Sequence, residues 1–253
     1  MKRFEGKVIC VTGGNSGIGR ATALAFAREG AQVVIAARRE NLGEEVVREI
    51  KKEGGEAAFV KTDVTVPLDL ENLFQKIKTT YGRFDCAFNN AGVGGPTARL
   101  ARQTTETWDL VMNTNLKGVW LCMKYEIQQM LEQGGGVIVN TASTAGISGS
   151  PGSAIYSASK HGVVGLTRSA AAEYATKNIR INSVCPGPIA TPMLENGFAL
   201  RPEMKEAYLD TIPMGRFGIP EEISGAVLWL CSNEASFITG YLMTIGGGQT
   251  ITP

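Results

Sequence analysis

The chain has 253 residues, 43% of them hydrophobic, which is enough for the core of one α/β domain. Its formal net charge of +1 argues against a general electrostatic attraction to nucleic acid or to a membrane surface. One histidine and five scattered cysteines match neither a metal site nor a disulfide framework, so we expect no metal and buried, reduced thiols. The first apolar run is too short for a signal peptide or a membrane span, and we expect a soluble cytoplasmic protein.

Short apolar runs alternate with longer amphipathic stretches along the chain. The runs predict strands at residues 7–12, 32–36, 57–62, 84–89, 136–141, 179–185 and 241–245. The amphipathic stretches predict helices at residues 17–29, 41–53, 66–81, 104–132, 153–177 and 220–231. Alternating βα units build a parallel sheet with right-handed crossovers. The sequence therefore predicts an α/β, single-domain Rossmann fold over residues 1–253, a doubly wound parallel sheet of about seven strands flanked by helices.

One late segment departs from this alternation. Residues 191–217 contain Pro192, Pro202 and Pro213 around a weak helical pattern. A long irregular segment in an α/β domain often carries function. We therefore expect residues 191–217 to form a substrate loop or lid.

The first predicted strand leads directly into a glycine-rich turn and then a helix. The turn reads Thr12-Gly13-Gly14-Asn15-Ser16-Gly17-Ile18-Gly19. Gly13 permits a sharp exit from the strand, Gly17 leaves room where a pyrophosphate would meet the helix N-terminus, and Gly19 lets helix and strand pack closely. An ordinary glycine-rich loop is the alternative, but the strand–turn–helix context favours nucleotide binding.

The glycines are spaced GxxxGxG rather than GxGxxG, and the turn resembles the cofactor turn of the short-chain dehydrogenase/reductase family. The likeness continues in order over essentially the whole chain, through Asn89-Asn90-Ala91-Gly92, Asn115, Ser143, Tyr156-Ser157-Ala158-Ser159-Lys160 and Pro186-Gly187-Pro188-Ile189-Ala190-Thr191. It implies an NAD(P)-dependent oxidoreductase that interconverts a carbonyl and a secondary alcohol by hydride transfer. Gly246 departs from the pattern, because the family often has an acidic residue at this position. That ending usually forms part of a subunit contact, so the difference puts the oligomer interface in doubt and not the chemistry.

The identity of the cofactor depends on the end of the second predicted strand. By the family register this is Ala37, followed by Arg38 and Arg39, where an NAD site would carry a carboxylate for the ribose 2′-hydroxyl. Two arginines suit a 2′-phosphate instead, so NADP is favoured over NAD. Two points oppose this: the arginines could be a solvated helix start, and Ser16 stands where NADP-preferring relatives often carry a basic residue.

The resemblance also assigns cofactor contacts on several loops. Asp63 is similar to the family residue that meets the adenine amino group, although it could instead cap the next helix. The backbone of Ile189 and the hydroxyl of Thr191 are expected to meet the nicotinamide amide. The complete expected set is Gly13, Asn15, Ser16, Gly17, Ile18, Gly19, Arg38, Arg39, Asp63, Val64, Asn90, Ala91, Gly92, Tyr156, Lys160, Pro186, Gly187, Ile189 and Thr191.

Tyr156 and Lys160 are four residues apart in a helical stretch and so share one face. A phenol, with a pKa of about 10, is a poor base at neutral pH, and a fixed ammonium beside it favours the phenolate. The resemblance implies that Tyr156 is the general acid/base and that Lys160 holds the ribose and lowers the phenol pKa. His161 points about 100° away around the helix, and we expect it to be structural.

Ser143 and Asn115 complete the catalytic set that the resemblance implies. Ser143 would orient the substrate oxygen, and Thr141 and Thr144 are neighbouring small hydroxyls that could serve instead. Asn115 would hold a water that relays protons to the lysine, and Asn113 is the competing candidate.

The substrate and the assembly stay open at this level. The pocket is expected from residues 93–96, 147–152 and 193–214, which are mostly apolar or small. A 3-oxoacyl thioester, a sugar or polyol, and a hydroxysteroid remain candidates, the first two slightly favoured by resemblance. A non-catalytic dinucleotide sensor on the same fold is the alternative outside enzymes. Resemblance further implies a homotetramer built through the helices at residues 104–132 and 153–177.

Overall fold

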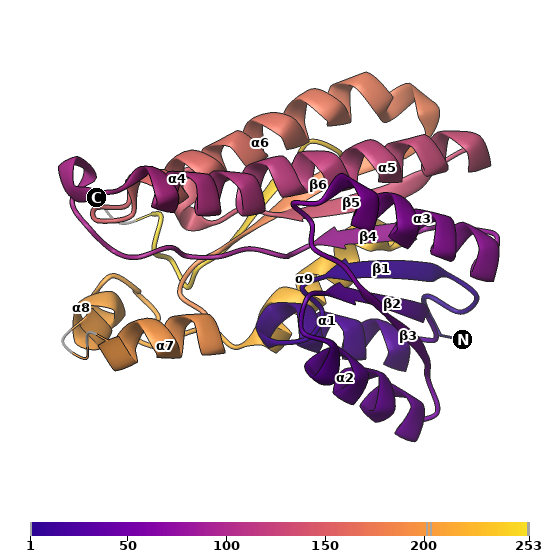
Figure 1. The fold of residues 1–253 in the computed structure, drawn as a ribbon, viewed down its shortest axis with the longest axis horizontal. Coiled ribbons are helices and arrows are strands. Elements are labelled where there is room, and N and C mark those ends of the chain that lie inside the picture. The colour runs from indigo at the N-terminus through magenta and orange to yellow at the C-terminus, as the bar shows by residue number, and fades with distance from the viewer. Residues whose placement is uncertain (1, 201, 203, 252–253) are drawn as a thin grey trace.

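The strands of the computed structural model, which describes residues 2–200, 202 and 204–251, form one sheet (Figure 1). All pair in parallel, in the order β3-β2-β1-β4-β5-β6-β7. Their bounds are β1 Val8–Thr12, β2 Gln32–Ala37, β3 Glu56–Lys61, β4 Cys86–Asn89, β5 Gly136–Thr141, β6 Ile179–Pro186 and β7 Leu242–Ile245. The strand order reverses between β1 and β4, and ligands bind at the carboxyl ends of strands at such a point. The predicted single-domain Rossmann fold is confirmed.

The central strands are buried on both faces because their apolar residues alternate between two cores. Val8 and Cys10 of β1 belong to one core, and Ile9 and Val11 belong to the other. This explains why the strands read as nearly continuous apolar runs.

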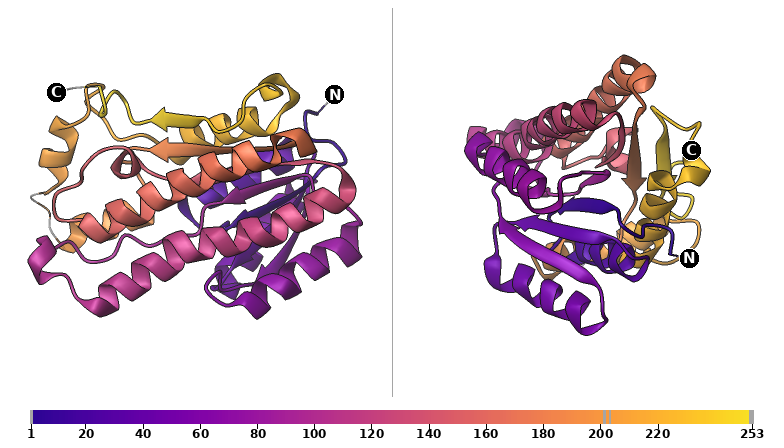
Figure 2. Two further views of the ribbon diagram at one scale, coloured as in Figure 1. Left: turned by 90° about the horizontal axis from the view of Figure 1, so that it is seen from above. Right: turned by 90° about the vertical axis from the view of Figure 1, so that its right-hand side faces the viewer.

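Helices cover both faces of the sheet (Figure 1). The core of Ile9 is shared by α1 (Gly17–Arg28), α2 (Glu40–Lys52) and α9 (Pro220–Cys231). The core of Val8 is shared by α3 (Pro67–Tyr81), α5 (Gly118–Gln133) and α6 (Ala154–Tyr174), and Figure 2 shows α5 and α6 side by side along this face. Beyond the carboxyl edge lie α7 (Pro192–Leu200) and α8 (Met204–Asp210), where the sequence predicts only a weak helix. Short 3-10 turns occupy Leu100–Arg102, Thr144–Gly146, Ala175–Lys177 and Asn233–Ala235.

The predicted continuous helix at residues 104–132 is wrong in one respect. A π-helical turn, Asn113–Lys117, separates α4 (Thr105–Met112) from α5. Asn115 is fully buried in this turn, and its side chain bonds the backbone of Val93. Single π turns are frequent at functional sites, and this one lies behind the carboxyl edge of β4.

Three further observations concern the cysteines, the helices and the groups that could bind a metal. All five cysteines are buried and free. Of the helices in the described part of the chain, none combines the length and apolar character needed to cross a membrane. Within residues 2–200, 202 and 204–251, no group of three or more histidine, cysteine or acidic side chains is arranged to hold a metal ion.

Candidate active site

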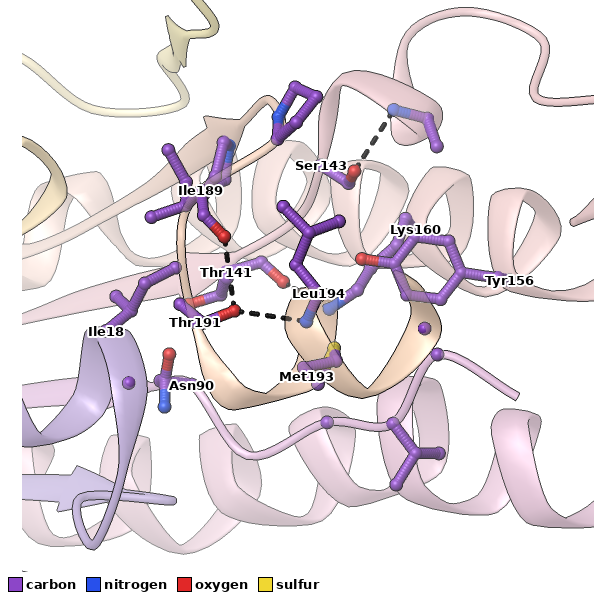
Figure 3. Close-up of a pocket in the computed structure, with 18 of the residues that line it drawn as sticks. Ile18, Asn90, Thr141, Ser143, Tyr156, Lys160, Ile189, Thr191, Met193 and Leu194 are labelled. Atoms are coloured by element: carbon purple, nitrogen blue, oxygen red, sulfur yellow. Dashed lines mark hydrogen bonds between the residues drawn. The ribbon is translucent and has the colours of Figure 1, made fainter. Parts of the chain in front are cut away.

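A cavity of about 1240 Å³ opens at the carboxyl edge of the sheet and extends from the turn after β1 to α7 and α8. Figure 3 shows the part of it that contains Tyr156 and Lys160. The site residues predicted from the sequence line this cavity with two exceptions, Gly19 and Asn115. Gly19 lies directly against Gly13, and Asn115 lies against Gly92, so both support residues that do line it.

The glycine-rich turn has the geometry that a bound pyrophosphate requires. Gly13 and Gly17 have φ angles of +65° and +52°, a region that favours glycine. A Cβ at Gly19 would overlap the carbonyl oxygen of Gly13, so only glycine allows helix α1 to pack this closely. Ser16 makes no side-chain cap on α1, whose first turn holds no acidic residue. The N-terminus of α1 therefore presents its N–H groups to an anion.

Thr12, the last residue of β1, holds the neighbouring loop in place. Its hydroxyl oxygen accepts hydrogen bonds from the backbone N–H groups of Asn90 (3.0 Å) and Ala91 (3.1 Å). The Asn90 amide in turn donates to the Thr12 carbonyl (3.2 Å). Sequence reasoning missed this role, although a hydroxyl at the end of β1, in register with Asn89 at the end of β4, was the available signal.

Arg38 and Arg39 lie together at one end of the cavity. Arg39 Nη2 donates to Ser16 Oγ (2.9 Å), while Arg38 Nη1 lies 3.9 Å from Asp63 Oδ2. The guanidinium of Arg39 thus supplies a positive charge beside Ser16, where the glycine-rich turn itself has no basic residue. Guanidinium, hydroxyl and helix N–H donors at one point match the chemistry of a phosphate. The donor set fits NADP.

Asp63 shapes its own loop. Its Oδ1 accepts from the backbone N–H (2.9 Å) and the hydroxyl (2.8 Å) of Thr65. The expected alternative, a cap on the next helix, is not what forms, because α3 begins at Pro67 with Val66 before it. Asp63 and Val64 both line the cavity, and their contacts with adenine stay a prediction.

The loop after β6 closes the other side. The Gly187 N–H donates to the Ile245 carbonyl (2.9 Å), which fixes this loop against β7. The Thr191 hydroxyl donates to the Ile189 carbonyl (3.2 Å; Figure 3). A Cβ at Gly17 would lie 3.3 Å from Thr191 Cγ2, so the two loops approach each other closely. The two groups expected to meet the nicotinamide amide therefore lie together beside the helix N-terminus.

Tyr156 and Ser143 come from separate elements and meet in the cavity. Ser143 lies just beyond β5, where its oxygen accepts from the Ala145 N–H (3.1 Å), and Tyr156 is in the first turn of α6. Burial raises the pKa of the Tyr156 phenol, a hydrogen bond with Ser143 opposes this, and Tyr208 raises it further. Burial is the largest of these influences, so the pKa of the phenol lies above its ordinary value, and a lowering of this pKa by Lys160 stays a prediction.

Lys160 is buried on the same helix face as Tyr156. Its Nζ donates to the Thr141 carbonyl (2.7 Å) and lies 5.7 Å from the centroid of the Tyr156 ring. Burial lowers the pKa of this ammonium to about 8. The lysine is thus fixed at the floor of the cavity.

The buried amide of Asn115 is fully engaged. Its Oδ1 accepts from the Val93 N–H (2.8 Å), and its Nδ2 donates to the Val93 carbonyl (2.9 Å) and to Ser159 Oγ (3.3 Å). A Cβ at Gly92 would lie 3.2 Å from this Oδ1 and 3.7 Å from Lys160 Nζ. Asn115 therefore fixes the loop of Gly92 and Val93, which lies between Asn115 and Lys160. A water relay through Asn115 stays a prediction.

The structure places the competing residues as follows, and the choice of Ser143 over Thr141, which also lines the cavity, stays a prediction. Asn113 is exposed, whereas Asn115 is buried. The Thr144 hydroxyl donates to Gln249 Oε1 (3.1 Å). His161 is exposed and its Nδ1 lies 2.9 Å from the Ser157 carbonyl oxygen, which agrees with a structural role.

The expected substrate segments supply the far wall of the cavity. Each contributes residues: Val93, Gly94, Gly95 and Pro96; Ser148, Gly149 and Ser150; and Met193, Leu194, Gly197, Phe198, Met204, Tyr208, Asp210, Thr211 and Pro213. The wall combines thioether, aliphatic and aromatic groups with small hydroxyls. Gln249 also lines the cavity, and no sequence motif marks it.

Known proteins resemble the chain over nearly its full length. Residues 13–250 match a family model described as enoyl-(acyl carrier protein) reductase. A 3-oxoacyl-[acyl-carrier-protein] reductase of Thermotoga maritima is 43% identical, over 98% of this chain and 100% of its own. A cyclohexanol dehydrogenase of Acinetobacter sp. is 42% identical, over 98% of this chain and 96% of its own.

Solved structures agree with these relatives. An actinorhodin polyketide ketoreductase variant with NADPH has a TM-score of 0.93 and 35% identity, covering 97% of this chain and 98% of its own. Fold, motif order and sequence identity thus point the same way. The chain is an oxidoreductase that belongs to the short-chain dehydrogenase/reductase family.

Proposed function

We propose that this enzyme interconverts a small carbonyl compound and its secondary alcohol with NADP, and that Tyr156 moves the proton. The observation that carries the proposal is the meeting of Tyr156, Ser143 and Lys160 in one cavity with the glycine-rich turn. When bound, the nicotinamide cofactor supplies or accepts the hydride. The protein residues supply position, charge and the proton.

Tyr156 is prepared to give a proton to a carbonyl oxygen. Burial keeps the pKa of its phenol above the ordinary value, so the phenol is protonated at neutral pH, the form that reduction needs. The Ser143 hydroxyl orients the substrate oxygen beside the phenol. For alcohol oxidation, the positive charge of Lys160 and of an oxidised nicotinamide ring would favour the phenolate. Asn115 would complete a relay to water from behind Lys160.

NADP preference rests on the end of β2. No carboxylate stands at Ala37, and Arg39 together with Ser16 offers donors to a 2′-phosphate. The structure with NADPH cited above is consistent with this choice. NAD is the alternative cofactor.

The substrate is proposed from the wall of the cavity and from the relatives. A cyclic ketone or alcohol fits the apolar Met193, Leu194 and Phe198, and the cyclohexanol dehydrogenase supports this class. A 3-oxoacyl thioester is the second candidate, supported by the Thermotoga reductase. Residues 191–217 would form the lid over either substrate.

The experiment is a turnover test with wild type and Tyr156→Phe. NADPH and NADH oxidation would be followed with cyclohexanone, acetoacetyl-coenzyme A and a 3-oxosteroid, and NADP⁺ and NAD⁺ reduction with glucose. We expect NADPH-dependent turnover by wild type, and a loss of at least about 100-fold in Tyr156→Phe with NADPH binding retained. Wild-type activity in the variant would refute the role of Tyr156. Tight cofactor binding without turnover of any compound would favour a dinucleotide sensor.

We also propose a homotetramer in the cytoplasm. Trp108 on α4 and Trp120 on α5 each expose 47% of their surface, and the outward residues of α6 include the small Ala158 and Gly165. Exposed tryptophans beside a face of small residues suit a helix-to-helix subunit contact. Sedimentation would test this, and a stable monomer would refute it. Five reduced, buried cysteines agree with a reducing compartment.

A further inference from the structure

The segment after β7 turns back across the mouth of the cavity. Its glycines permit contact with the exit of the proposed lid: the Met214 N–H donates to the Gly247 carbonyl (3.1 Å). Gly247 and Gly248 have φ angles of +59° and +90°. A Cβ at Gly247 would lie 2.8 Å from Ile212 Cγ2, and one at Gly248 would lie 2.9 Å from Pro213 Cγ. The backbone thus runs directly beneath residues 212–214 and brings Gln249 to the edge of the site.

The amide of Gln249 bridges two segments that are remote in sequence. Its Oε1 accepts from the Thr144 hydroxyl (3.1 Å), and its Nε2 donates to Thr211 Oγ1 (3.0 Å). Thr144 follows Ser143, which bonds the Tyr156 phenol. Thr211 follows α8, which carries Tyr208. One side chain therefore connects the catalytic edge of the sheet with the lid.

The hydrogen-bond roles in this bridge require an amide. The Thr211 hydroxyl gives its proton to the Tyr208 carbonyl (2.7 Å), so toward Gln249 it can only accept. The Thr144 hydroxyl is a donor and needs an acceptor. Glutamine offers both a donor and an acceptor, whereas a carboxylate could not donate to Thr211 and an apolar side chain could do neither.

The described residues of α8 bury little surface. None of the residues of α8 that the structure describes is buried. Tyr208 packs edge-on against Phe198 of α7, with ring centroids 5.7 Å apart, so this contact joins two parts of the lid rather than the lid and the sheet. Segments with little buried surface open at low free energy. A hydrogen bond from the body of the protein therefore helps to fix α8, together with the contacts of residues 212–214 with Gly247 and Gly248.

We propose that Gln249 is a positioning residue that couples the lid to the catalytic edge, and that it sets the affinity for substrate by holding Tyr208 in the wall of the cavity. The proposal rests on the proposed function in one respect, because it takes residues 191–217 as the lid. Tyr208 lines the cavity and influences the Tyr156 phenol, so release of α8 would alter the substrate side of the reaction. The glycine-rich turn and the cofactor end of the cavity would keep their own contacts.

The test is a double-variant cycle on the full-length protein. Gln249→Met keeps the length of the side chain without its donor and acceptor, and Thr211→Val removes the lid partner. Gln75→Met, on the exposed face of α3, is the matched control. Hydrogen exchange of residues 204–211, the unfolding temperature, and KM and kcat for cyclohexanone with NADPH would be measured for each protein.

We expect Gln249→Met to speed exchange in α8 about fivefold, the effect of losing one hydrogen bond to the lid, with little change in the unfolding temperature. Thr211→Val should speed exchange at least as much, because it also removes the bond to the Tyr208 carbonyl. The double variant should be no faster than the faster single one, because both changes break the same link. KM for cyclohexanone should rise about fivefold while kcat stays within about twofold.

Two results would overturn the proposal. The first is exchange in Gln249→Met equal to that in Gln75→Met, or effects of the two substitutions that simply add. The second is a fall in kcat with KM unchanged. Hydrogen exchange needs no turnover, so it decides the coupling even if cyclohexanone is not a substrate, and failure of the proposed function would be recognised separately by the Tyr156→Phe experiment.

Discussion

Glu126 gives the sharpest prediction about the stability of this protein. Its side chain is fully buried on α5, where Oε2 accepts from Asn89 Nδ2 (2.9 Å) and Oε1 makes no hydrogen bond with any described residue. The neighbouring groups that titrate are the buried thiols of Cys10 and Cys122, and neither supplies a positive charge. Burial therefore raises the pKa of the carboxyl from 4.5 to about 8, and the Asn89 bond opposes this only in part.

The sign of the pH effect follows from these two values. Between pH 4.5 and about 8 the folded protein holds a proton on Glu126 that the unfolded chain has released, so stability falls as the pH rises. Each pH unit within this window costs about 1.4 kcal/mol, which amounts to about 4 kcal/mol between pH 5 and pH 8. Glu126→Gln keeps the shape and the acceptor for Asn89 and removes the titration. The variant should match wild type near pH 5 and exceed its stability by about 4 kcal/mol at pH 8.

Urea unfolding at pH 5, 6, 7 and 8, at one protein concentration, would measure the difference. Glu71→Gln on the exposed face of α3 is the control, and its stability should differ from that of wild type by less than about 0.5 kcal/mol at each pH. Curves of stability against pH that run parallel for Glu126→Gln and wild type would refute the reasoning. Such a result would mean that the carboxyl is ionised inside the protein at neutral pH.

Two further predictions concern the cofactor end of the site. Arg39→Ala should raise KM for NADPH by about 10- to 100-fold, the loss of a charged hydrogen bond, and leave KM for NADH nearly unchanged; an equal rise for both cofactors would argue against a 2′-phosphate site. Gly19→Ala should lower the unfolding free energy by about 1–3 kcal/mol, because its Cβ would meet the Gly13 carbonyl, and should weaken NADPH binding. Gly225→Ala, at an exposed position of α9 where a Cβ has open space, is the control for a calorimetric comparison and should not be destabilised.

The fold was predictable from the sequence because its signals are local. Runs such as Val8 to Thr12 are apolar without a break, and this pattern arises when both faces of a strand are covered. The π-helical turn at Asn113–Lys117 was not predictable from periodicity. It depends on hydrogen bonds between Asn115 and Val93, 22 residues earlier, and no helical pattern records that contact.

The preference for NADP or NAD could not be predicted from the residues of the glycine-rich turn alone. Ser16 opposes NADP when the glycine-rich turn is considered alone, because it is not basic. In the structure the guanidinium of Arg39, 23 residues later, donates to the Ser16 hydroxyl. The positive charge thus reaches the turn from the end of β2. The cation at a phosphate site can follow β1 or β2, so the sequence of the turn after β1 is not enough to predict it.

The catalytic set was predictable from the sequence, whereas the pKa of its central residue was not. Tyr156 and Lys160 share a helix face, and this spacing is visible in the sequence. The pKa of the phenol depends on how deeply the cavity encloses it, and that enclosure comes from residues on several separate segments, among them Ser143 and Tyr208. Gln249 joins two of these segments over separations of 105 and 38 residues. The residues that carry the chemistry can therefore be found from local sequence spacing, whereas the pKa of Tyr156 depends on contacts that exist only in the folded chain.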